Sequence, residues 1–133
     1  MRIAFIVPGP PVPCARARVV SRPGRKTRAV TPSKTRAYKV HVAWYARVAV
    51  ATLRQPATGS PPPSIWPLDA TSYGVRLMVY READRGDADN FYKGVVDACH
   101  GILWSNDMRI THALVEMFID RKNPRVEVEA WTR

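Results

Sequence analysis

Four aspartates and one lysine lie close together in this chain, between Asp87 and Asp107. Asp89, Lys93 and Asp97 follow one another at intervals of four residues, so on a helix they share one face. Clustered carboxylate oxygens are the hard ligands that Mg²⁺ and Mn²⁺ prefer, and a divalent cation offsets the repulsion between the carboxylates. This stretch therefore predicts a site for a divalent cation, with a lysine beside it.

The charge distribution indicates what such a site would act on. The chain has 21 Lys and Arg against 11 Asp and Glu, a formal net charge of +10. All the acidic residues lie from Asp69 onward, so the first half of the chain is purely basic. A basic surface of this kind is typical of proteins that bind polyanions such as nucleic acids. A bound cation can activate water and stabilise charge on a phosphate, and a lysine can do the latter as well. Together these features predict a metal-dependent phosphodiesterase that acts on nucleic acid.

Each of these residues also has a purely structural explanation. Asp87 could serve only as a helix N-cap, and Asp89 with Lys93 could form only a surface ion pair. Asp97 could be a solvated or locally hydrogen-bonded helix residue, and Asp107 could belong only to a turn. The prediction therefore depends on the combination of the residues, and not on any one of them.

The pattern of apolar, proline and glycine residues predicts the elements that position this stretch. Thr31 as N-cap and Pro32 at the first helical position begin a helix that continues through Arg54, with no further glycine or proline until Pro56. The expected elements are a strand at 2–7, a long loop or hairpin at 8–30, the helix from Thr31, a proline-rich connector at 55–69, a strand at 71–81, a helix at 87–101, a turn at 103–107 and strands at 108–120 and 125–131. We expect one α+β domain over residues 1–133, with two helices packed on a small mixed sheet in the order β-α-β-α-β-β.

The first helix carries two further expectations. Lys34, Arg36 and Lys39 lie in its first turns, where basic side chains oppose the helix dipole unless an anion binds there. Its later turns are apolar almost all round, which predicts burial against the sheet and against a partner subunit. Trp44 and Tyr45 are expected in the core or in that interface.

The cysteines and histidines argue against other classes of site. Cys14 and Cys99 form neither a disulfide framework nor a paired metal motif, and three scattered histidines lack the spacing of zinc ligands. Free thiols and the lack of a recognisable signal segment fit a reducing cytoplasm. No apolar run is long enough to span a membrane. We expect Cys99 and Trp104 to lie in the core.

The stretch DRGDADNFYKGVVDACHGILWSND resembles the core of the RusA family of Holliday-junction resolvases. That family carries an Asp-x-Asp-Asn-x-x-Lys motif, an aspartate four residues later and a Trp-x-Asp-Asp-like turn. The segments PGPPVPCARARV and TPSKTRAYKVHVAW are similar to its other block, which has a proline-rich start, an arginine-rich loop and a Thr-Pro-x-Lys-Thr helix start. The resemblance covers nearly the whole chain in the same order.

The resemblance implies a RusA-like α+β homodimer from a bacterium, a phage or a prophage. It implies an endonuclease that depends on Mg²⁺, with Mn²⁺ as an alternative, and that needs no small-molecule cofactor. Its substrate would be the four-way DNA junction of recombination and repair, nicked symmetrically in two opposing strands, which suits a two-fold protein. Asp87, Asp89 and Asp107 match the family's metal-binding carboxylates, and Lys93 matches its catalytic lysine.

Two further positions match less closely, and the contacts with DNA are our own assignment. Asp97 falls on a recurrent family position. The family's Asp-Asp turn reads Asn106-Asp107 here, so Asn106 would support the site as a neutral ligand. We assign contacts with the DNA backbone to four basic residues: Arg16, Arg18, Lys34 and Arg36.

Three other functions stay open on the sequence. The first is a catalytically inactive DNA-binding module of the same fold. The second is a basic structural protein that binds nucleic acid in a ribonucleoprotein. The third, a metal phosphohydrolase for free nucleotides, is disfavoured because a small substrate needs no large basic surface.

Overall fold

The computed structural model of the chain describes residues 1–15, 18–21, 23, 24, 26, 28–30, 32–53, 59 and 65–133, and for 18–20 and 28–30 it describes the backbone alone. Its elements, in chain order, are β1 (Arg2–Pro8), β2 (Arg18–Val20), β3 (Arg28–Val30), α1 (Ser33–Leu53), β4 (Tyr73–Arg81), α2 (Ala88–Ala98), the short 3₁₀ helix η1 (Asp107–Arg109), β5 (Ile110–Ile119) and β6 (Arg125–Thr132).

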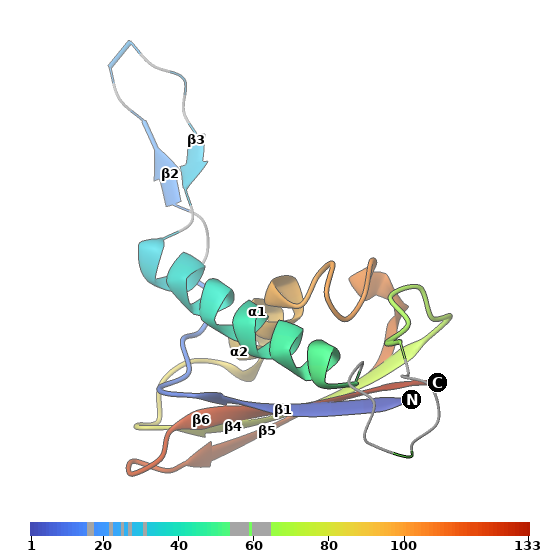
Figure 1. Ribbon diagram of the computed structural model, residues 1–133. Coiled ribbons are helices and arrows are strands. Elements are labelled where there is room, and N and C mark those ends of the chain that lie inside the picture. Colours follow the sequence, from blue (N-terminus) through green and yellow to red (C-terminus); the bar gives the residue numbers. More distant parts are fainter. Residues whose placement is uncertain are drawn as a thin grey trace.

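Four strands form a mixed sheet in the order β1-β6-β4-β5, and both long helices lie against one of its faces (Figure 1). Strands β4 and β5 are parallel, whereas β6 is antiparallel to both β4 and β1. Parallel neighbours need a crossover connection, and here α2 is that connection. The predicted α+β fold, with its order β-α-β-α-β-β, is confirmed.

The core lies between the sheet and the two helices. Alternate residues of each strand point inward, and the side chains of Val75, Leu77 and Val79 in β4 are fully buried. Phe91 and Val95 of α2 pack against them in the same apolar cluster. Helix α2, which carries the predicted site, is therefore packed firmly against β4, the strand that precedes it in the chain.

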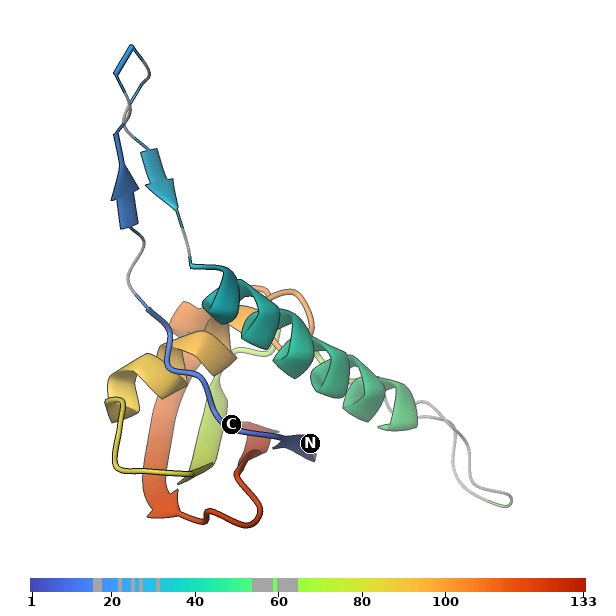
Figure 2. The same ribbon diagram turned by 90° about the vertical axis from the view of Figure 1, so that its left-hand side faces the viewer.

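Strands β2 and β3 form a separate antiparallel hairpin. They stand away from the sheet, beyond the first turn of α1 (Figures 1 and 2). The expected loop or hairpin at 8–30 thus contains a hairpin. Of the predicted connector, residues 65–69 have no regular structure, and apart from Gly59 the rest lies outside the described residues.

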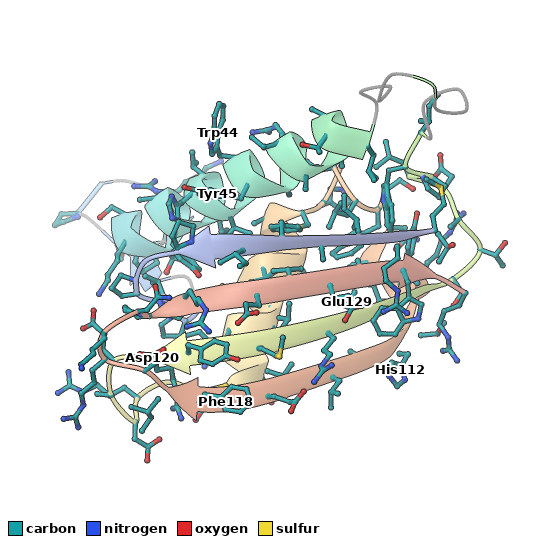
Figure 3. All side chains as sticks on the ribbon, turned by 60° about the horizontal axis from the view of Figure 1, so that its bottom comes forward. Trp44, Tyr45, His112, Phe118, Asp120 and Glu129 are labelled. Carbon is teal, nitrogen blue, oxygen red and sulfur yellow. The ribbon has the colours of Figure 1, made fainter. Side chains whose placement is uncertain are left out.

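Helix α1 buries one face against the sheet, as expected, and its opposite face stays exposed in the single chain, so the expected burial against a partner subunit stays a prediction. Val42 and Ala46 are fully buried on the face toward the sheet, but Val40, Trp44 and Val48 are exposed by 69 %, 61 % and 45 %. Trp44 points away from the sheet, so it is not a core residue (Figure 3). A helix that packs on one layer buries one face only, and in this chain the opposite face also carries apolar residues. Tyr45 packs against the core as expected.

The ends of the elements differ from the predictions by a few residues. The predicted N-cap Thr31 lies outside the described residues, and α1 begins with Pro32 accepting the first helical hydrogen bond from the Arg36 amide, at 3.2 Å. Helix α2 ends at Ala98, because the chain must turn back before β5 and Gly101 adopts a φ of 78° in that turn. No helix among the described residues is long and apolar enough to cross a membrane.

Candidate active site

Asp87 caps α2 through its backbone and not through its carboxylate. The Asp87 carbonyl accepts hydrogen bonds from the amides of Asn90 and Phe91, at 3.1 and 3.2 Å. Its side chain makes no capping hydrogen bond and is exposed. The N-cap explanation therefore accounts for the conformation of Asp87 but leaves its carboxylate available for another role.

Gly86 fixes the direction in which the chain enters Asp87. Its φ is 86°, a region that strongly favours glycine. A Cβ atom at this position would lie 2.8 Å from the ring of Phe91 and 3.3 Å from Cγ of Pro13. Close packing between the β4–α2 loop, α2 and the N-terminal segment therefore holds Asp87 in place.

Lys93 pairs with Asp97 and not with Asp89. Lys93 Nζ lies 3.2 Å from Asp97 Oδ2, and Lys39 Nζ of α1 lies 3.3 Å from the same oxygen. Asp89, in the first turn of α2, is exposed and makes no ion pair with Lys93. The surface-pair explanation of Asp89 and Lys93 is therefore wrong. Asp97 is locally hydrogen-bonded, and it joins two helices through two lysines.

Asp97 also determines the electrostatics of Lys93. The hydrogen bond from Lys93 to Asp97, and then the charge of Asp97, raise the pKa of the lysine, with smaller contributions from Cys14 and Asp107. Burial raises the pKa of Tyr92, and the charge of Asp107 raises it further. Lys93 is therefore cationic at neutral pH, and Asp107 acts electrostatically on two neighbouring side chains of α2.

A buried tryptophan places Asp107 near α2. Trp104 is fully buried and donates from Nε1 to the carbonyl of Val96, at 3.2 Å. The prediction of Trp104 as a core residue and turn anchor is thus confirmed, as is the burial of Cys99. Asn106 caps η1 by accepting a hydrogen bond from the Met108 amide, at 2.9 Å. Asp107 follows as the first, exposed residue of η1.

The three predicted metal ligands have suitable chemistry but are not preassembled. Asp87, Asp89 and Asp107 are all exposed and supply hard carboxylate oxygens. Among the described residues, no three carboxylate, imidazole or thiol groups lie close enough together to hold a metal ion. The assignment of these aspartates as ligands therefore stays a prediction.

The N-terminal segment is hydrogen-bonded to both helices near this end of α2. The Cys14 amide donates to the Asn90 carbonyl at 3.0 Å, and the Ala15 amide donates to Thr35 Oγ1 at 3.3 Å. Residues 12–15 thus cross α2 between Asp89 and Lys93 and lead toward the β2–β3 hairpin. Cys14 Cβ would lie 3.5 Å from a Cβ at Gly94, so this crossing is close.

The predicted DNA contacts fall into two groups. Lys34 and Arg36 are exposed in the first turns of α1, next to this crossing. Arg16 lies outside the described residues, and for Arg18 only the backbone in β2 is described.

Lys39 is the site residue that sequence reasoning missed. The sequence identifies it only as one of several basic residues in the first turns of a helix. No local pattern connects Lys39 with Asp97, because they lie 58 positions apart and on different helices. The four-residue spacing of Lys93 and Asp97 indicates a lysine beside this carboxylate, but it identifies Lys93 and not Lys39.

A family comparison covers the part of the chain that contains these residues. The model of the family described as endodeoxyribonuclease RusA matches residues 8–130, which include every site residue named above. A search of curated proteins finds no match. Because the matched region covers nearly the whole chain, the protein belongs to the RusA endodeoxyribonuclease family.

Proposed function

We propose that the protein is a divalent-metal-dependent endonuclease that resolves four-way DNA junctions by paired symmetric nicks, in recombination and repair. The observation that carries this proposal is the side-chain cluster on α2. Lys93 is held by Asp97 and feels the charge of Asp107, the exposed Asp89 lies one turn before it on α2, and the N-terminal segment crosses the helix between Asp89 and Lys93. The membership in an endodeoxyribonuclease family supports the reaction class.

Asp87, Asp89 and Asp107 would hold Mg²⁺, or alternatively Mn²⁺. Their carboxylates are exposed and can rotate, and the charge repulsion between them falls when a cation binds. When bound, the cation would polarise a phosphate oxygen and lower the pKa of water. Asn106 would support Asp107, because its cap fixes the first turn of η1 from which that carboxylate projects.

Lys93 would donate hydrogen bonds to an oxygen of the scissile phosphate, where negative charge develops during cleavage. Lys93 is protonated at neutral pH, and Asp97 raises its pKa further and restrains its flexible side chain. Lys39, on the same carboxylate oxygen, would add positive charge on the α1 side of the site.

The basic elements next to α2 would bind the other phosphates of the DNA. Arg16 and Arg18 belong to the segment that leads into the hairpin, and Lys34 and Arg36 are exposed at the start of α1. Neutralised phosphates release counterions, so binding by this surface would weaken as salt increases.

We further propose that the protein acts as a homodimer, because paired nicks need two active sites. The exposed stripe of Val40, Trp44 and Val48 on α1 supports an interface of this kind. Light scattering of the wild type should give twice the mass of the chain, and Trp44→Lys should reduce it to a monomer. A monomeric wild type at micromolar concentration would contradict the dimer.

A synthetic four-way junction tests the main proposal. The wild type should nick it symmetrically with Mg²⁺ and not with EDTA, and Asp89→Asn should abolish cleavage while junction binding is retained. Lys93→Ala should lower the turnover more than the affinity. The control is Glu129→Gln, which removes a carboxylate from the face of the sheet that the helices leave open (Figure 3). Binding without cleavage in both Mg²⁺ and Mn²⁺ would instead favour an inactive junction-binding module.

A further inference from the structure

A cavity of about 320 Å³ lies beside the predicted active site. Its walls include the prolines of the N-terminal segment, the end of β4 with the loop that follows it, and Lys34 of α1. Phe91 of α2 also lines it. Its volume falls in the range of about 300–1,000 Å³ that is usual for small-ligand sites.

The apolar wall of this cavity is held rigidly. Pro13 and Phe91 both pack against Gly86, so closely that a Cβ atom added at Gly86 would force their side chains to move. One residue further on, the hydrogen bond from the Cys14 amide to the Asn90 carbonyl fastens the segment to α2. The cavity is therefore formed before any ligand arrives, which lowers the entropic cost of binding.

Three cationic side chains line the cavity, and two of them have no carboxylate partner among the described residues. Lys34 and Arg85 are exposed and form no ion pair within the described residues. Arg81 is more buried, with a side-chain exposure of 13 %, and pairs with Asp84, which is 85 % exposed.

The Nε atom of Arg81 is buried and has no hydrogen-bond partner among the described residues. A buried donor without a partner is destabilising, so the Arg81 side chain keeps an unused hydrogen-bond donor beside the cavity. Glu82 is the one acidic residue of the lining, which leaves the cavity with an excess of positive charge.

The position of the cavity links it to the predicted chemistry. Arg85 precedes Asp87 by two residues, and Phe91 follows it by four. A DNA strand whose phosphate reached Asp87 and Asp89 would therefore bring an adjacent nucleotide to the cavity mouth. A nucleotide combines an anionic phosphate with an apolar ring face, and the cavity offers both complementary surfaces.

We propose that this cavity is a nucleotide subsite, which holds one nucleotide of the substrate strand next to the scissile phosphate. Lys34, Arg81 and Arg85 bind the phosphate, and the proline rings contact the base or the sugar. The proposal rests on the proposed nuclease function for the identity of the ligand, but the binding itself does not require cleavage.

Nuclear magnetic resonance titration of the wild-type chain with deoxynucleoside monophosphates tests the subsite directly. The amides of Glu82, Ala83 and Arg85 should shift, and the monophosphates should bind at least tenfold more tightly than either inorganic phosphate or free deoxynucleosides. Equal affinity for phosphate and monophosphate would reduce the cavity to a simple anion site and overturn the proposal. So would the absence of shifts in this loop.

Two variants connect the subsite with the reaction. Ala83→Leu should fill the cavity and raise KM for junction cleavage about tenfold, with kcat changed less than twofold. Arg85→Ala, at an exposed loop position, should also raise KM about tenfold. Arg85→Lys keeps the positive charge and should return KM most of the way to the wild-type value. Ala113→Leu, on the exposed edge strand β5, is the control of equal size.

The outcomes separate the two proposals. If the wild type cleaves junctions but neither Ala83→Leu nor Arg85→Ala changes KM, the subsite is wrong and the nuclease function stands. If monophosphates bind at the cavity but no cleavage occurs with Mg²⁺ or Mn²⁺, the subsite stands and the nuclease function fails. Thermal unfolding of each variant distinguishes loss of the subsite from loss of the fold.

Discussion

Replacing Asp97 by asparagine removes the carboxylate that Lys93 and Lys39 share. Both ammonium groups lie within 3.3 Å of the same Asp97 oxygen, which places them at most about 7 Å apart. Without the carboxylate they repel each other by about 0.6 kcal/mol in a water-like dielectric. The variant should therefore have a lower pKa for Lys93, because it loses the hydrogen bond and the charge that raise this pKa in the wild type.

The effect on stability should be modest. The side chains of Lys39 and Asp97 are 28 % and 30 % exposed, and that of Lys93 is 64 % exposed. Ion pairs with this much exposure contribute about 0.2–1 kcal/mol each. Asp97→Asn should therefore destabilise the fold by about 1 kcal/mol, which lowers the Tm of a chain of this size by about 4 °C.

The pH dependence of this contribution has a definite sign. The pKa of Lys93 is raised in the folded state from an ordinary value of 10.5. Its stabilising contribution is therefore complete below that ordinary value and is lost as the pH rises through the folded-state pKa. The difference in stability between wild type and Asp97→Asn should stay constant from pH 6 to pH 9 and shrink above about pH 10.5.

Titration of the Lys93 side-chain resonances, followed by junction cleavage and thermal unfolding, provides the assay. Lys39→Met is the matched control, because it removes one ammonium group but keeps the Lys93–Asp97 contact. It should raise the pKa of Lys93 slightly, because a like charge is removed, whereas Asp97→Asn lowers it, and it should reduce the cleavage rate less than Asp97→Asn does. An unchanged Lys93 pKa in Asp97→Asn would refute the positioning role of Asp97, whatever happened to activity.

Three further predictions follow from packing and charge. Gly94→Ala should stabilise the chain by up to about 1 kcal/mol, because the new Cβ would make only ordinary contacts with Cys14. Gly74→Ala should destabilise the chain, because the new Cβ would clash with the Trp131 ring. Chemical denaturation measures the change in unfolding free energy for both variants. Burial raises the pKa of Cys99 to about 12, so an alkylating reagent at pH 8 should label this thiol only after unfolding. Rapid labelling of the native protein, measured by mass spectrometry, would contradict this prediction. Junction affinity should fall steeply between 50 and 200 mM salt, and a flat response in a gel-shift titration would rule out binding through the basic surface.

The uncovered face of the sheet offers no comparable chemistry. Its charges are paired across the strands, with Arg76 on Glu116 and Arg2 on Glu129, and Tyr80 stacks on Phe118 beside Arg125. The exposed aspartates of the predicted site lie instead on α2 and η1. The sheet therefore separates a face of paired charges from the face that carries the proposed site.

The element order and the candidate site residues could be read from the sequence, because both depend on local patterns. Alternating apolar residues placed the strands, the four-residue spacing of Asp89, Lys93 and Asp97 placed them on one helical face, and the order of motifs indicated the family. The start of α2 at Asp87 was also predictable, since the cap depends on neighbouring residues. The same local reasoning could not decide whether the outward side of α1 is buried, because burial depends on which layers exist around a helix.

Only the tertiary structure decided which residues meet. Parallel pairing of β4 with β5 places α2 on the helix side of the sheet, and α1 then brings Lys39 to Asp97. The crossing of residues 12–15 over α2 sets the proline segment against the β4–α2 loop, and this contact creates the cavity. These contacts join residues that are distant in the chain. Because they form only when the helices and the sheet pack together, no spacing within the sequence specifies them.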